Sequence, residues 1–83
     1  MDVAGCLKLT DAAVISLAQE CNRTLTRLNL SGCDLISDEA VIFLAKTCLS
    51  LQLLDLRRCI SVSPLACYSL QCLNANLQVL YNQ

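Results

Sequence analysis

The chain has 83 residues, of which 55% are hydrophobic and 16% are charged, with six lysines and arginines against seven acidic residues. A chain of this length forms one small domain, and its net charge of −1 provides no basic surface for nucleic acid or for an anionic membrane. Histidine is absent, which excludes Ser-His-Asp triads, Cys-His pairs and histidine-containing metal sites.

Three helix starts follow one another along the chain, each marked by a hydroxyl residue that suits the N-cap position: Thr10, Ser37 and Ser63. Acidic residues follow the first two and proline follows the third, and both are favourable in a first helical turn. The first helix has apolar residues at the spacing of one helical face: Val14, Leu17, Ala18 and Cys21. The second repeats that spacing: Val41, Leu44, Ala45 and Cys48.

Two stretches after the first two helices share the pattern L-x-x-L-x-L-x-x-C, at residues 25–33 and 51–59. Leu28 and Leu54 are 26 residues apart, and a second step of the same length reaches Leu80. Leucines alternate with other residues in these stretches, as in a short strand with one buried side. We therefore predict five buried strand positions: Leu28, Leu30, Leu54, Leu56 and Leu80.

The repeating unit of 26 residues predicts an α/β fold of about three stacked strand-helix units, because one unit cannot bury its apolar side alone. We expect a solenoid with a parallel strand ladder on its concave face. Residues 1–83 would form one such segment, with a partial repeat at 1–24, repeats at 25–50 and 51–76, and a truncated repeat at 77–83. This interpretation makes the chain a piece of a longer array. We expect the isolated chain to self-associate through its apolar ends or to be only partly folded.

Residues between the buried strand positions should point away from the core and form a partner-binding surface. They are Arg27, Asn29, Leu53, Asp55, Arg57 and Tyr81. Arginine and tyrosine are enriched where protein interfaces are energetically strongest. Asp55 beside Arg27 or Arg57 fits an ion pair or a partner contact better than a catalytic group, so we assign no catalytic residue.

Seven cysteines occur without any C-x-x-C pair, which favours a structural role over a zinc or redox site or a set of disulfides. Cys33 and Cys59 fall where a strand turns, and there we expect small buried thiols with weak S–H hydrogen bonds to the backbone. Cys21 and Cys48 would fill helix ends. We expect no metal and no cofactor. The odd number of cysteines, without a signal peptide, points to the reducing environment of the cytoplasm or nucleus.

The pattern L-x-x-L-x-L-x-x-C, followed by an aliphatic residue, Ser or Thr, Asp and a helix that ends in Cys, resembles the cysteine-containing leucine-rich repeat. The resemblance covers nearly the whole chain and is weaker after Cys59, where Pro64 replaces the Asp and Asn74 replaces the closing Cys. It implies a non-enzymatic protein-binding module, as in the F-box/leucine-rich-repeat substrate receptors of SCF-type ubiquitin ligases, whose partner is a ubiquitination substrate. The alternative is a non-catalytic scaffold fragment unrelated to ubiquitination.

Overall fold

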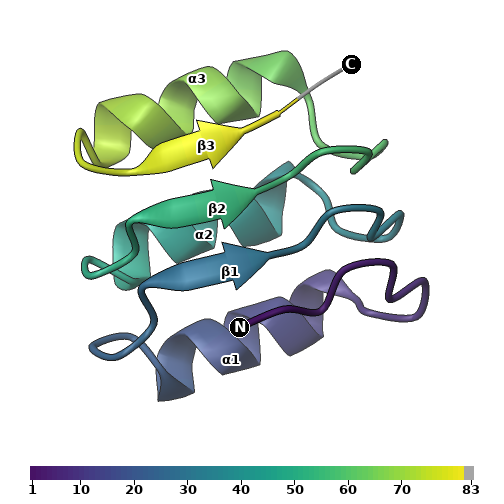
Figure 1. The fold of residues 1–83 in the computed structure, drawn as a ribbon, viewed down its shortest axis with the longest axis horizontal. Coiled ribbons are helices and arrows are strands. Elements are labelled where there is room, and N and C mark those ends of the chain that lie inside the picture. Colours follow the sequence, from purple (N-terminus) through teal and green to yellow (C-terminus); the bar gives the residue numbers. More distant parts are fainter. Residues whose placement is uncertain (82–83) are drawn as a thin grey trace.

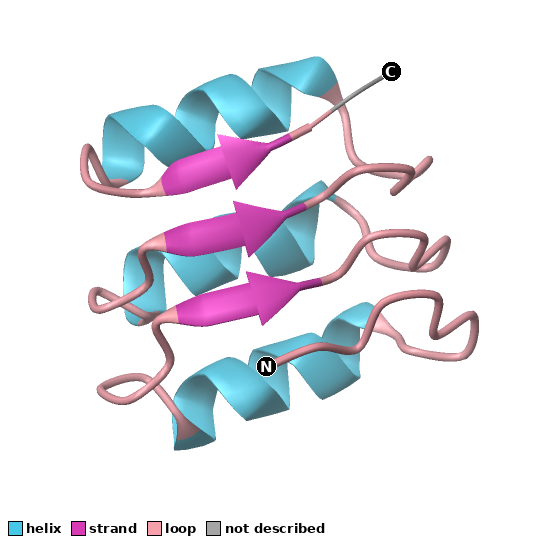
Figure 2. Ribbon diagram, viewed as in Figure 1, coloured by secondary structure: helices cyan, strands magenta, loops and turns pink. Residues whose placement is uncertain are grey.

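The computed structural model describes residues 1–81 and shows three helices packed on one side of a parallel sheet (Figures 1 and 2). The elements are α1 (Asp11–Glu20), β1 (Arg27–Asn29), α2 (Asp38–Thr47), β2 (Leu53–Asp55), α3 (Pro64–Leu73) and β3 (Gln78–Leu80). The strands lie in the order β1-β2-β3, so successive strand-helix units are neighbours in space. The helices leave the opposite side of the sheet open (Figure 1).

The three predicted helix starts are confirmed as N-cap positions. The Thr10 hydroxyl accepts a hydrogen bond from the Ala13 N–H at 3.4 Å, and the Ser63 hydroxyl accepts one from the Ala66 N–H at 3.2 Å. Ser37 occupies the same position without capping its own helix through its side chain. Its hydroxyl instead donates a hydrogen bond to Asp11 in the preceding unit.

Aspartates at the starts of α1 and α2 each hold the N-cap serine of the next helix. The Asp11 carboxylate accepts hydrogen bonds from the Ser37 hydroxyl and, at 2.8 Å, from the Ser37 N–H. The Asp38 carboxylate accepts bonds from the Ser63 N–H and hydroxyl, both at 2.7 Å. The sequence predicted only a favourable helix-start charge for these aspartates, whereas the structure makes them links between units.

Strand pairing confirms the first predicted repeat step. β1 and β2 are parallel, with Leu28 opposite Leu54. The chain start extends this ladder on the other side of β1, where Asp2 forms a parallel bridge with Asn29. The Val3 N–H donates to the Asn29 carbonyl at 3.0 Å. The first residues of the chain therefore form a short parallel pairing with β1, on the side away from β2.

The second predicted step is wrong by one residue. Leu54 lies opposite Val79, and Leu80 lies opposite Asp55 on the open side of the sheet. The reason is a missing residue, since one residue separates Leu77 from Val79 while two separate Leu51 from Leu54. Because side chains alternate along a strand, this shift exchanges the buried and outward positions of β3.

The core lies between the sheet and the helices and contains the four other predicted leucines, each at most 1% exposed: Leu28, Leu30, Leu54 and Leu56. Cys33 and Cys59 are also buried. The Cys33 thiol donates to the Val3 carbonyl at 3.3 Å, and the Cys59 thiol donates to the Leu30 carbonyl at 2.9 Å. The predicted S–H bonds are thus confirmed, and each one reaches back to the preceding unit.

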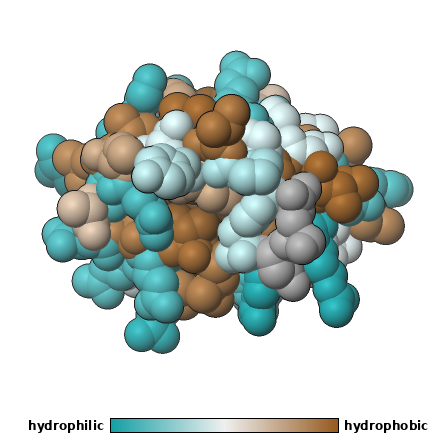
Figure 3. All heavy atoms as spheres, turned by 90° about the horizontal axis from the view of Figure 1, so that it is seen from above, coloured by the Kyte–Doolittle hydropathy of each residue, from teal (hydrophilic) through white to brown (hydrophobic). Residues whose placement is uncertain are grey.

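The end of the stack formed by α3 and β3 carries apolar surface among polar residues (Figure 3). Leu65 and Tyr68 on α3 are 80% and 75% exposed. On the central helix α2, by contrast, four residues are buried: Ala40, Val41, Leu44 and Ala45. Within residues 1–81, no helix has the length and apolar character needed to cross a membrane.

We expect Leu54→Ala to lower the free energy of unfolding by about 2–5 kcal/mol, because it leaves a cavity where β2 meets the helices. Leu53→Ala, one position away on the open side, is the matched control and should cost less than about 1 kcal/mol. Urea unfolding followed by circular dichroism measures both. Equal losses in the two variants would contradict the side-chain orientation of β2.

Candidate functional site

Two rows of side chains cross the open side of the sheet, which we call the strand face. The residues of each row come from β1, β2 and β3 and lie opposite one another in the parallel register. The first row is Arg27, Leu53 and Gln78, and the second is Asn29, Asp55 and Leu80. Four of the six predicted partner-binding residues therefore belong to these rows, and the structure brings them together in pairs.

The two rows differ in how freely their side chains can meet a partner. Arg27 and Gln78 are exposed and Leu53 is half-buried between them. In the second row Asn29 and Leu80 are half-buried, and Asp55 is buried. The first row thus offers a cation, an aliphatic side chain and an amide to solvent, side by side on three strands.

Arg57 follows β2 and forms an ion pair with Asp55. Its Nη2 lies 2.7 Å from Asp55 Oδ2, and its Nε lies 3.0 Å from Asp55 Oδ1. The hydrogen-bonded guanidinium lowers the pKa of the Asp55 carboxyl, although burial opposes the effect. The Arg57 side chain remains 53% exposed. Asp55 is therefore a fixed, neutralised anion, while Arg57 still presents its cation to solvent.

Asp55 also shapes the backbone, and its counterparts Asn29 and Asp2 in the two preceding units do the same. Its Oδ1 accepts a hydrogen bond from the Arg57 N–H at 3.1 Å. Asn29 accepts one from the Ser31 N–H at 3.0 Å, and Asp2 accepts one from the Ala4 N–H at 2.9 Å. Each bond closes an Asx turn at the carboxyl end of the strand or bridge, and backbone pairing between units continues beyond it to Gly5 and Gly32. These residues position the strand ends in addition to lining the strand face.

Tyr81 does not lie on the strand face, contrary to the sequence prediction. It packs against the hydrophobic core, and its hydroxyl donates to the Val62 carbonyl at 2.8 Å. Burial raises the pKa of its hydroxyl. The missing residue before Val79 explains the error, since it turns Tyr81 toward the core and Leu80 outward.

Gln78 and Leu80 are the strand-face residues that the sequence analysis missed. The signal that could have found them is the alternation Leu77, Val79, Tyr81, in which every second residue is large and apolar. Among residues 1–81, no group of three or more His, Cys, Asp or Glu side chains is arranged to hold a metal ion. The strand face is a surface of mixed polarity.

Substitutions at Asp55 should separate its charge from its turn-forming oxygen. Asp55→Asn keeps the acceptor that Asn29 uses in the preceding unit, so we expect a loss of about 0.2–1 kcal/mol from the half-exposed ion pair. Asp55→Ala also removes the turn bond and should cost about 1–3 kcal/mol. Thermal or urea unfolding at pH 7 measures the difference, and equal losses would contradict the turn role.

The ionic part of the Asp55 contribution should depend on pH. The folded-state pKa is lowered, so the stabilising effect is complete above the unfolded-state pKa of about 4 and is lost as the pH falls through the folded-state value. The stability difference between the natural chain and Asp55→Asn should therefore be constant near neutral pH and shrink in acid. Urea titrations from pH 7 to pH 2 provide the measurement. A difference that grows in acid would contradict the ion pair.

The seven cysteines, all free thiols in the structure, should differ strongly in reactivity. Cys6 and Cys72 are exposed and should react first with iodoacetamide at neutral pH. Burial raises the pKa of the Cys33, Cys48 and Cys59 thiols, which should react only when the fold opens. Mass spectrometry of timed samples should show all seven additions in denaturant. Early labelling of Cys59 would contradict its buried bond.

A family model described as a leucine-rich repeat matches residues 21–45, which contain β1 and most of α2. No curated protein matches the chain. The matched segment has the leucine ladder and the helix that the geometry shows in each unit. Residues 21–45 are therefore similar to a leucine-rich repeat, and the strand-helix units with their parallel sheet fit an α/β fold of the leucine-rich-repeat kind.

Proposed function

We propose that this chain is a protein-protein interaction module that contacts its partner through the strand face. The observation that carries the proposal is the row of Arg27, Leu53 and Gln78, two exposed residues and a half-buried leucine, aligned across three strands on the side of the sheet that the described helices leave open. Leucine-rich repeats generally mediate protein-protein interactions, which agrees with this use of the surface. Stacked repeats also provide long continuous surfaces of this kind.

The chemistry of the row favours a partner segment with an acidic group next to an apolar one. Arg27 forms no ion pair with any residue of 1–81, so its charge is available to a partner. Leu53 supplies apolar contact, and the Gln78 amide can both donate and accept hydrogen bonds. The Asp55 carboxylate is already paired with Arg57 and adds little repulsion toward an acidic partner. Charge would then set orientation and encounter, while Leu53 would supply buried area.

For the finer function, we propose substrate recognition for an SCF-type ubiquitin ligase, as in the F-box/leucine-rich-repeat proteins that the sequence resembles. The support is the cysteine-containing repeat pattern, whose thiols at Cys33 and Cys59 serve as hydrogen-bond donors. A donating thiol must be reduced, which favours the cytoplasm or nucleus as the site of action. The alternative is a structural scaffold repeat unrelated to ubiquitination, in which the strand face has no protein partner.

The test compares capture of cellular proteins by the natural chain and by the triple variant Arg27→Ala/Leu53→Ala/Gln78→Ala. We expect the variant to lose most of its specific partners, because a few residues such as arginines carry most of the binding energy of an interface and truncating one of them costs more than about 1 kcal/mol. The matched control is Glu39→Ala/Lys46→Ala on α2, which removes exposed charges from the helix layer and should keep the partners. Quantitative mass spectrometry of the captured proteins provides the measurement.

Two further readings separate the alternatives. Accumulation of the captured proteins after proteasome inhibition would support the ubiquitin-ligase proposal, and unchanged levels would favour an interaction module unrelated to ubiquitination. Sedimentation of the purified chain identifies self-association through the exposed α3 surface, which would otherwise resemble partner binding. Equal capture by the natural chain and the triple variant, with both folded, would overturn the strand-face proposal.

A further inference from the structure

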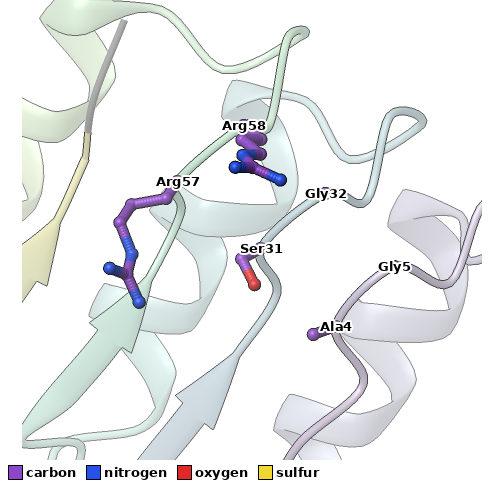
Figure 4. Close-up of a pocket in the computed structure, with 6 residues that line it drawn as sticks. All are labelled: Ala4, Gly5, Ser31, Gly32, Arg57 and Arg58. Carbon is purple, nitrogen blue, oxygen red and sulfur yellow. The ribbon is translucent and has the colours of Figure 1, made fainter.

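A pocket of about 530 Å³ lies at the carboxyl end of the sheet, outside the strand face. It is lined by the same two turn positions of three successive units: Ala4 and Gly5, Ser31 and Gly32, and Arg57 and Arg58 (Figure 4). Its volume is in the usual range for sites that bind small ligands or side chains. The pocket is therefore a product of stacking, since no single unit forms it.

Two of the turn residues that line this pocket are glycines, so no side chain covers the backbone at these positions. Gly5 and Gly32 have φ angles of 72° and 75°, in the left-handed region that favours glycine. A side chain added at Gly5 would point into open space. The amides of the two glycines bond to the next unit, Gly5 to the Ser31 carbonyl at 2.7 Å and Gly32 to the Arg57 carbonyl at 2.9 Å. The floor is thus fixed backbone that a ligand can approach closely.

The third unit departs from this pattern at the turn residue itself. Arg58 has a φ of 63°, the same left-handed conformation that its two counterparts adopt as glycines. This conformation is strained for a residue with a side chain, and strain of this kind is concentrated at functional sites. A glycine at this position would avoid the strain, whereas Arg58 places a cation at the pocket.

The charges that line the pocket have one sign. Arg57 and Arg58 are its only charged lining residues among those described, and no acidic side chain belongs to the lining. Arg57 gives its Nε and Nη2 to Asp55, which leaves Nη1 without a bond in the described structure. Arg58 has no ion pair within residues 1–81. The two side chains leave adjacent positions of one turn in different directions (Figure 4).

We propose that this pocket binds a phosphate group, with Arg58 as the principal cation. Guanidinium groups match phosphate oxygens through paired hydrogen bonds, and the Ser31 hydroxyl supplies a further polar group at the pocket wall. The source is either free phosphate or a phosphorylated side chain of a protein held on the strand face. The second source deepens the proposed function and rests on it, whereas binding of free phosphate does not.

The test titrates the ¹⁵N-labelled chain with three probes, followed by amide chemical shifts in phosphate-free buffer. The probes are inorganic phosphate, the peptide Ala-Ala-phosphoserine-Ala-Ala and its unphosphorylated twin. We expect saturable shifts at Gly5, Gly32 and Arg58 with the two phosphate-bearing probes, and none with the twin. Tighter binding of the phosphopeptide would identify a protein-borne phosphate, and equal binding would identify the free anion.

The decisive variant is Arg58→Gly, matched to Arg23→Gln, which removes one arginine charge at the opposite end of the strands. Arg58→Gly should raise the unfolding midpoint, because it relieves the left-handed strain, and should weaken phosphate binding about tenfold. Arg23→Gln should change the affinity less than about twofold. A merely structural Arg58 would not combine higher stability with lost binding.

Two results would overturn the assignment: no saturable shift at the two glycines with either phosphate probe, or unchanged affinity in Arg58→Gly. The triple variant Arg27→Ala/Leu53→Ala/Gln78→Ala leaves the pocket residues intact and should still bind inorganic phosphate. If the triple variant loses partner capture but still binds phosphate, the loss is therefore due to the strand face and not to the pocket. If the natural chain captures partners but does not bind phosphate, the pocket proposal is wrong and the strand-face proposal stands.

Discussion

The whole structure depends on the pairing of each short strand with the strand of the next unit. Each strand has three residues, which is too few to hold its place alone. The parallel register that places Leu28 opposite Leu54 also aligns the other contacts between units. Asp38 then reaches Ser63, and Cys59 reaches the Leu30 carbonyl. The core, the strand face and the pocket all exist because neighbouring units share this register.

The sequence was sufficient to predict the unit and its first repeat, because periodicity at Leu28, Leu30, Leu54 and Leu56 directly reflects burial. It was insufficient in β3, where deletion of one residue left two possible alternations. Leu80 continued the 26-residue step, while Val79 continued the alternation with its neighbours. In the structure Val79 takes the inward position. Tyr81, the next inward residue, then packs against the core and donates a hydrogen bond to the Val62 carbonyl.

The binding properties of the surface were harder to predict than the fold, because an outward position on a strand does not show whether a side chain already bonds to another residue. Arg27 and Leu53 lie on the strand face as predicted. Asp55 lies there too, but its two oxygens are occupied by Arg57 and by the turn that follows β2. Such a turn bond requires backbone geometry that spacing alone does not specify. The pocket was missed for the same reason, since it arises from left-handed turns in three units.

The links between units have a direction, and this makes similar units unequal. A carboxylate such as Asp38 bonds forward to the helix start of the following unit, whereas a thiol such as Cys59 bonds backward. The third unit has Pro64 where a forward carboxylate would stand, so it can receive this link without passing one on. A chain in which the second and third units were exchanged in sequence would have that proline in the middle of the stack. The order of the units is thus part of the information that specifies the fold, beyond the pattern that the units share.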